Sequence, residues 1–147
     1  MISLLEKKLN QINLKKIDEN LPQAAVLILI VENDKDYSIV FTERSKRLPS
    51  HAGEVSFPGG KKENEDKNLI ETALRETHEE IGIKPSSIKV LGRMNSQESR
   101  FGLSVTPYIG YTTGNLEFIL EPKEVETIFT VPLEYLKKNP LISNKIT

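Results

Sequence analysis

The order of hydrophobic and polar residues divides the first part of the chain into one helix and two strands. Hydrophobic residues recur at helical spacing over residues 2–12, which predicts an amphipathic helix that ends before Pro22. An unbroken apolar run, residues 24–31, is rich in Val and Ile and predicts a strand buried on both faces. A polar turn follows, and residues 37–42 predict a second strand that pairs with the first.

The rest of the chain mixes further elements with loops. Residues 43–62 are rich in charge, Gly and Pro and predict mostly loop. A helix is predicted over residues 69–83, because Gly82 and Pro85 are typical of a helix end. The remaining predictions are strands over residues 88–94, 103–111 and 116–120, an acidic loop over 121–126 and a short helix over 132–138. Because these elements do not alternate as βαβ units, we expect an α/β fold of the α+β type, with helices packed on a mixed β-sheet.

Composition narrows the class of protein. A chain of 147 residues suits one domain, so we expect a single domain over residues 1–147. The net charge is −1, which gives no general attraction to nucleic acid or to an anionic membrane. The longest apolar run is far shorter than the roughly 20 residues that cross a bilayer, and the first residues lack the apolar core of a signal peptide. We therefore expect a cytoplasmic protein without a nucleic-acid or membrane partner, and a homodimer stays open.

Residues 72–83 carry the candidate chemistry. On a helical wheel, Glu76 and Glu80 lie one turn apart on one flank of the predicted helix, with Glu79 beside them. Like charges at this spacing repel by roughly 0.2–0.5 kcal/mol per pair, and a divalent cation would remove that repulsion. The alternative is a solvated helix face with ordinary glutamates. The core-facing stripe of the same helix is predicted to hold Ile70, Leu74, Thr77 and Ile81.

Two stretches of sequence together resemble a known motif. Phe-Pro-Gly-Gly at 57–60, followed by Arg-Glu-Thr-His-Glu-Glu-Ile-Gly-Ile at 75–83, resembles the Nudix box. Its second half matches the family pattern except at Thr77, where the family carries a hydrophobic residue. The first half is one residue longer than usual, so that Asp66 or Lys67 falls at the position of a family glutamate, and Asp66 is the more plausible acid.

The longer spacing also occurs in the coenzyme A-cleaving branch of the Nudix family. Thr-Glu-Arg-Ser at 42–45, and Gly53 ahead of the Phe-Pro-Gly-Gly stretch, resemble the upstream signature of that branch. Pro49 stands where the branch carries arginine. Residues 105–107 and 124–133 also resemble the branch. The resemblance implies a Nudix-like α/β/α sandwich, and it leads us to expect that the usual C-terminal strand and helix are missing.

The resemblance also implies roles for the acidic residues. Glu76 and Glu80 are expected to bind Mg²⁺ or Mn²⁺, and Glu79 is expected to be a third ligand or the base that takes the proton of the attacking water. In some Nudix enzymes the base lies in a distant loop. The candidates for such a base in this chain are Glu121, Glu124 and Glu126.

The basic and glycine residues of the motifs have expected roles as well. Arg75 is expected to orient the glutamates through an ion pair with an acid of the preceding loop, such as Asp66 or Glu65. The backbone at Gly59 and Gly60 is expected to approach metal or phosphate closely, because these residues have no Cβ. Two residues of the basic cluster ahead of the box are expected to bind substrate phosphates, Arg44 and Arg47.

The expected activity is hydrolysis of the diphosphate bond of coenzyme A to 3′,5′-ADP and 4′-phosphopantetheine. One alternative is a Nudix hydrolase acting on another small nucleotide, such as ADP-ribose, NADH or a dinucleoside polyphosphate, and Pro49 keeps it open. A second alternative is a catalytically weak Nudix module that binds a nucleotide as a sensor.

Overall fold

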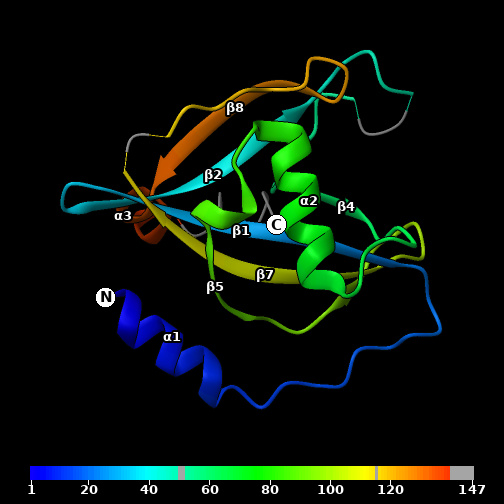
Figure 1. Cartoon of the computed structure of the whole chain (residues 1–147), viewed down its shortest axis with the longest axis horizontal. Coiled ribbons are helices and arrows are strands. Elements are labelled where there is room, and N and C mark those ends of the chain that lie inside the picture. Colours follow the sequence, from blue (N-terminus) through cyan, green and yellow to red (C-terminus); the bar gives the residue numbers. More distant parts are fainter. Residues whose placement is uncertain (50–51, 115, 140–147) are drawn as a thin grey trace.

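The computed structural model describes residues 1–49, 52–114 and 116–139 (Figure 1). The helices and strands are, in chain order, α1 (Ile2–Gln11), β1 (Gln23–Asn33), β2 (Asp36–Arg44), β3 (Val55–Ser56), β4 (Gly59–Lys61), α2 (Leu69–Ile81), η1 (Pro85–Ser87), β5 (Lys89–Arg93), β6 (Gln97–Glu98), β7 (Ser104–Thr113), β8 (Val125–Pro132) and α3 (Leu133–Lys138). Over these described ranges, no helix is long and apolar enough to span a membrane.

A mixed β-sheet organises the fold. Its main path, among the described residues, runs β3-β2-β1-β7-β5. β1 is parallel to β7 along most of its length and antiparallel to β2 at its C-terminal half. The N-terminal half of β1 pairs instead with β4, while β8 adds to the far edge of β2. The sheet therefore opens between β4 and β2, at the end of the fold that holds the site described below.

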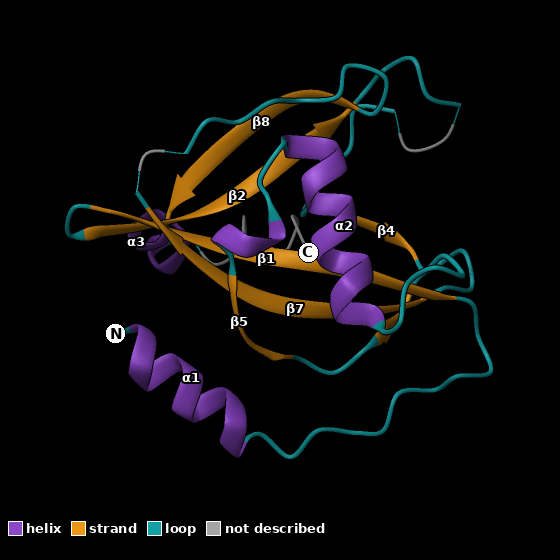
Figure 2. Cartoon of the chain, in the orientation of Figure 1, coloured by secondary structure: helices purple, strands orange, loops and turns teal. Residues whose placement is uncertain are grey.

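β1 is buried on both faces, as its apolar run predicts. Ala25, Leu27 and Leu29 face α2 and form the larger core cluster. Ile30 belongs to a second cluster on the opposite face, where it is grouped with Leu9 of α1. Figure 2 shows α2 lying across the central strands and α1 beside β5. The predicted α+β architecture, with helices packed on a mixed sheet, is thus confirmed.

α2 begins at Leu69, as predicted, and ends at Ile81, two residues before the predicted end. The side chain of Asn68 accepts a hydrogen bond from the backbone N–H of Glu71 and caps the N-terminus. Gly82 ends the helix in the left-handed region, at φ 79°. Thr77 is fully buried at the position where the Nudix pattern has a hydrophobic residue, and its hydroxyl donates to the carbonyl of Ala73 at 2.7 Å. That bond satisfies the hydroxyl without disturbing the core.

The predicted core stripe of α2 is confirmed except at Ile70. Thr77 and Ile81 are buried and Leu74 packs on the core, but Ile70 is 37% exposed. The buried face also includes Leu69, Ala73 and the acidic Glu80, because a hydrogen bond to the backbone holds the Glu80 side chain inside the protein.

Two predictions near the C-terminus, one strand and one loop, are also wrong. Residues 116–120 form no strand, because they cross the end of α2 by separate backbone hydrogen bonds instead of joining the sheet. Residues 125–132, of which the first two were assigned to an acidic loop, form β8. The loop prediction for residues 43–62 missed the short strands β3 and β4. β8 lies at an edge with several polar residues exposed, so its sequence lacks the hydrophobic run of a central strand.

Candidate active site

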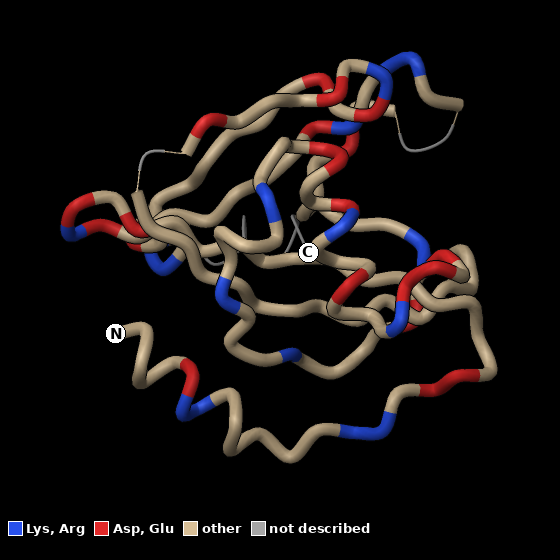
Figure 3. Tube along the Cα trace, in the orientation of Figure 1, with Lys and Arg blue, Asp and Glu red and all other residues tan. Residues whose placement is uncertain are grey.

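Three carboxylates come together beside the open part of the sheet. Glu76 and Glu80 project from α2, and Glu124 lies in the turn that precedes β8. One carboxylate oxygen from each residue lies within 4.8 Å of the other two. Figure 3 shows that the acidic positions in the C-terminal half of α2 and those of this turn lie at the same end of the fold. Three hard oxygen donors at this separation match the ligand preference of Mg²⁺ or Mn²⁺.

Glu79 lies outside this trio. Its side chain is 52% exposed, and both of its oxygens lie 3.3 Å from the Nη1 atom of Arg75. The helical wheel placed Glu79 in a patch with Glu76 and Glu80, whereas the third carboxylate of the cluster is Glu124. Of the acidic loop residues considered from sequence, Glu124 is therefore the one that the fold brings to the site.

Two consecutive glycines shape the floor of the site. The backbone N–H of Gly59 donates to the carboxylate of Glu80 at 2.9 Å. A Cβ on Gly59 would lie 2.3 Å from the carbonyl oxygen of Ala25, so only glycine lets β4 approach β1 here. A Cβ on Gly60 would lie 2.6 Å from the carboxyl carbon of Glu76. Both glycines make close approaches, to the acidic cluster and to β1, while their expected approach to metal or phosphate stays a prediction.

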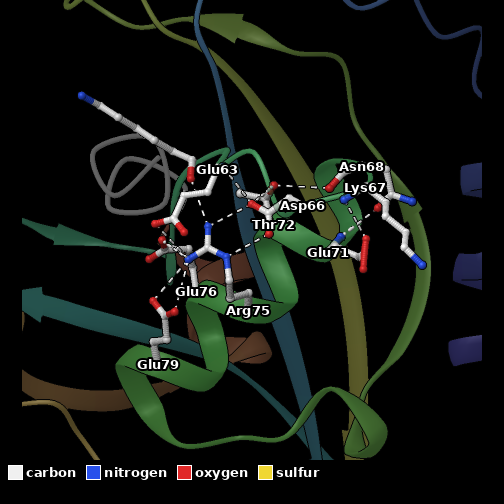
Figure 4. A network of polar contacts seen from close by, with 10 residues as sticks. Glu63, Asp66, Lys67, Asn68, Glu71, Thr72, Arg75, Glu76 and Glu79 are labelled. Atoms are coloured by element: carbon white, nitrogen blue, oxygen red, sulfur yellow. Dashed lines mark hydrogen bonds and ion pairs between the residues drawn. The ribbon is translucent and has the colours of Figure 1, made fainter.

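Arg75 connects the cluster to the loop before α2 (Figure 4). Its Nε and Nη2 atoms donate to the two oxygens of Asp66 at 2.9 and 3.0 Å, in a bidentate ion pair. Its Nη1 atom donates to Glu76 at 2.9 Å. The expected ion pair is confirmed, and its acid is Asp66 rather than Glu65. Arg75 thus holds the carboxylate of Glu76 from one side while Gly60 leaves room for it on the other.

Asp66 is itself fixed by several donors. The hydroxyl of Thr72 and the backbone N–H of Glu63 each donate to Asp66 at 2.9 Å. The hydrogen bonds from Arg75 are the largest cause that holds the pKa of the Asp66 carboxyl well below its usual range. Arg75 is therefore anchored by a carboxylate that stays ionised at every physiological pH.

The acidic cluster shifts the pKa values of its own members. Burial raises the pKa of Glu80 from its ordinary value of 4.5 to about 8. The N–H of Gly59 and the guanidinium of Arg44 oppose this rise. The nearby carboxylates of Glu76 and Glu124 add to it. Burial first, and like charges second, favour the proton on Glu80 at neutral pH, and a divalent cation would favour its release.

Glu76 follows the same pattern more weakly. Burial raises its pKa to about 6, and the Arg75 guanidinium opposes the rise. The charges of Glu79 and Glu124 add to it. Two carboxyl groups of one cluster, among the described residues, thus have pKa values well above 4.5. Such shifts are frequent at active sites, so we take this cluster as the candidate functional site.

The two predicted phosphate-binding arginines lie at different distances from the cluster. Arg44 ends β2, is half-buried and lies close enough to lower the pKa of Glu80. Its backbone is fixed on both sides, because its N–H donates to Glu54 at 2.8 Å and its carbonyl accepts from Gly53 at 3.0 Å. Arg47 lies three residues further along, with an exposed side chain. The structure therefore brings Arg44 to the acidic site and leaves Arg47 on the loop above it.

Glu124 owes its place to contacts that the sequence does not reveal. Its carbonyl accepts a hydrogen bond from the backbone N–H of Ser45 at 2.9 Å. The next residue, Val125, pairs with Arg44 across β2 and β8. The start of β8 is thereby joined to the end of β2. The strand β8, which the sequence did not predict, therefore places this carboxylate close to α2.

Comparison with known proteins agrees with this geometry. The family model of the NUDIX domain matches residues 21–146, so the chain belongs to the NUDIX family. Among solved structures, the Ap4A hydrolase of C. elegans superposes with a TM-score of 0.65 at 19% identity, over 80% of this chain and 85% of that one. The NUDIX domain of Shewanella oneidensis NrtR, solved with ADP ribose, gives a TM-score of 0.60 at 18% identity, over 82% and 81%. Both show that the fold is shared.

Curated relatives are closer in sequence. The Uncharacterized Nudix hydrolase NudL of Yersinia enterocolitica is 44% identical over 114 residues, which are 78% of this chain and 58% of the relative. Nudix hydrolase 15, mitochondrial, of Arabidopsis thaliana is 43% identical over 120 residues, 80% of this chain and 42% of the relative. The chain thus spans about half the length of these relatives. The Nudix resemblance inferred from the motif is confirmed at the level of the family.

Proposed function

We propose that this protein is a divalent-metal-dependent hydrolase that cleaves the diphosphate bond of a nucleotide derivative, with coenzyme A as its substrate. The observation that carries the proposal is the cluster of Glu76, Glu80 and Glu124 next to the guanidinium of Arg44. Placing like charges together in a buried position is energetically unfavourable. A cation with a bound polyphosphate would offset that unfavourable energy and would need these ligands.

The three carboxylates would hold Mg²⁺ or Mn²⁺, with Glu76 and Glu80 as the ligands from α2 and Glu124 as the ligand from the turn before β8. When bound, the ion would polarise a phosphoryl oxygen and make a water molecule more acidic. Arg75 would keep the Glu76 carboxylate turned toward the site, because it is itself held by Asp66. Gly59 would do the same for Glu80 through its backbone N–H.

Glu79 is the proposed general base. With Glu124 in the cluster, Glu79 is not needed as the third ligand, and its exposed carboxylate is accessible to a water molecule. The oxygen of that water forms a bond to one phosphorus, the bond from that phosphorus to the bridging oxygen breaks, and the water proton passes to Glu79. Arg44 would offset the negative charge that the leaving phosphate gains.

Coenzyme A is the proposed substrate because of the sequence features shared with its branch of the family. These features are the longer spacing between Gly60 and Arg75 and the upstream residues 42–45 and 53. Arg44 and Arg47, at the end of β2 and in the following loop, would bind the diphosphate and the 3′-phosphate. Pro49, where the branch carries arginine, favours a second candidate, a nucleoside diphosphate derivative without a 3′-phosphate, such as ADP-ribose.

A substrate panel tests the proposal. Coenzyme A, ADP-ribose, NADH and a dinucleoside polyphosphate are each incubated with the protein and Mg²⁺, and the products are identified by mass. We expect 3′,5′-ADP and 4′-phosphopantetheine to form fastest. Glu80→Gln should lower kcat/KM by about 100-fold or more, because even outer partners of metal sites contribute about 10–100-fold. Glu134→Gln, at a side chain 73% exposed on α3, is the matched control. Equal activity of the two variants would contradict the proposal.

A further inference from the structure

Residues 119–121, named here the strap, cross the C-terminal end of α2. The backbone N–H of Ile119 donates to the carbonyl of Ile81 at 2.9 Å, and the N–H of Glu121 donates to the carbonyl of Glu80 at 3.1 Å. The last four carbonyls of a helix have no partner within it, so they need hydrogen-bond donors from elsewhere. The strap supplies two of them from a distant part of the chain.

Gly82 makes room for the strap. It adopts φ 79°, which turns the chain away from the helix axis. A Cβ on Gly82 would lie 2.8 Å from the Cβ of Ile119 and 3.0 Å from its backbone N and O atoms. The glycine is therefore required twice, once for the backbone conformation and once for the contact with the strap.

Glu121 joins the two acidic halves of the site. Its N–H bonds the backbone of Glu80, and its carbonyl accepts from the N–H groups of Glu124 at 3.0 Å and Val125 at 2.9 Å. One residue thus lies between the backbone of a ligand on α2 and the backbone of the ligand before β8. The side chain of Ile119 is 67% exposed, so the strap is held by backbone hydrogen bonds more than by packing.

We propose that the strap positions Glu124 as a metal ligand, so that binding of a divalent cation and docking of the strap on α2 stabilise each other. This inference rests on the proposed function. The docked strap holds the carboxyl groups of Glu76, Glu80 and Glu124 within 4.8 Å of one another, so negative charge on one disfavours charge on the others until a cation offsets it. Coupling of this kind is reciprocal: loss of the strap's hydrogen bonds weakens cation binding, and the cation protects those bonds.

The first experiment compares two substitutions at Ile119. Ile119→Pro removes the N–H that donates to Ile81, whereas Ile119→Ala keeps the N–H and removes only an exposed side chain. Mn²⁺ affinity is measured by electron paramagnetic resonance of the free ion. We expect Ile119→Pro to bind Mn²⁺ about 10–100-fold more weakly, the range for loss of an outer-shell support, and Ile119→Ala to bind it like the parent protein.

A second measurement uses the unsubstituted protein and avoids any folding defect of the proline variant. Amide hydrogen exchange is followed with and without Mg²⁺, and the N–H groups of Ile119 and Glu121 should exchange more slowly when Mg²⁺ is present. Glu124→Gln should abolish this protection. In the Glu124→Gln background, Ile119→Pro should cause no further loss of Mn²⁺ affinity, because both changes act on one ligand.

The failure of this inference differs from the failure of the proposed function. If Ile119→Pro binds Mn²⁺ like the parent while Glu124→Gln weakens binding, or if Mg²⁺ leaves the strap amides unprotected, the strap has no positioning role and the metal site stands. If the parent protein binds no Mn²⁺, or if Glu124→Gln binds it as tightly as the parent, the metal site itself is refuted.

Discussion

Replacing Gly60 with alanine tests the geometry of the site with a single methyl group. The added Cβ would lie 2.6 Å from the carboxyl carbon of Glu76 and 2.8 and 2.9 Å from its two oxygens. Ordinary contact begins near 3.4 Å, so the carboxylate must move by about 0.8 Å. Arg75 holds it from the other side at 2.9 Å, and the movement therefore strains or breaks that bond.

The displacement sets the size of the expected effect. A misplacement of about 1 Å in a catalytic arrangement can lower the rate by about 100-fold, which corresponds to about 3 kcal/mol of transition-state stabilisation. Mn²⁺ affinity should fall in parallel, because Glu76 is a proposed ligand. Thermal stability should change little, since Gly60 does not adopt a positive φ and the new methyl group meets the end of a side chain.

Steady-state hydrolysis of coenzyme A, or of whichever substrate the panel shows to turn over fastest, gives kcat/KM for the variant. Gly92→Ala is the matched control. Gly92 lies on β5, far from the acidic cluster in the fold. A Cβ on Gly92 would lie 3.1 Å from the side chain of Leu9. We expect nearly unchanged kcat/KM for Gly92→Ala. Parent-like kcat/KM and Mn²⁺ affinity in Gly60→Ala would show that Glu76 is not held where the chemistry occurs.

Two further predictions follow from the charged groups. Arg75→Lys loses the bidentate bond to Asp66, so kcat/KM should fall by about tenfold or more and Tm should drop, as measured by kinetics and calorimetry. A parent-like result for both would contradict the orienting role. When a chelator has removed divalent cations, the free energy of unfolding should decrease as pH rises from about 5 to 8. The reason is that Glu76 and Glu80 keep their protons in the folded protein, whereas in the unfolded chain their pKa values are near 4.5 and the protons have been released. The contribution of Asp66 has the opposite sign and is lost only at lower pH, so it is constant in this window. Mg²⁺ should restore stability at pH 8, and denaturant titrations that show no pH dependence would refute the assignment.

Much of the fold could be predicted because its central elements have strong local patterns. β1 is an unbroken apolar run, and α2 combines helical periodicity with a cap at each end. The position of the helix and most of its buried face were therefore predictable, but the burial of Glu80 was not. Glu80 points inward because Gly59 donates to it, and that partner belongs to a different element. Periodicity alone could not show that Ile70 would face outward.

The site could be predicted where its residues lie within the two sequence motifs and their immediate neighbours. Glu76, Glu80 and the ion pair of Arg75 with Asp66 come from neighbouring stretches of sequence. Glu124 depends on the pairing of β8 with β2, which is a long-range contact between an edge strand and the sheet. Its sequence offered only a run of loop acids, in which no residue differs in type from the others. The fold was needed to separate Glu124 from Glu121 and Glu126.

The pairing of β2 with β8 also determines which residues near the site can change without moving the acidic cluster. The two strands bring Arg44 and Glu124 to the same end of the sheet, and Ser45, the first residue after β2, adds a backbone hydrogen bond to Glu124. We expect substitutions at Arg47, which is exposed and takes no part in this pairing, to leave the acidic cluster where it is. With the proposed role of Arg47 in phosphate binding, such substitutions would change which nucleotide is bound while Glu76, Glu80 and Glu124 stay together.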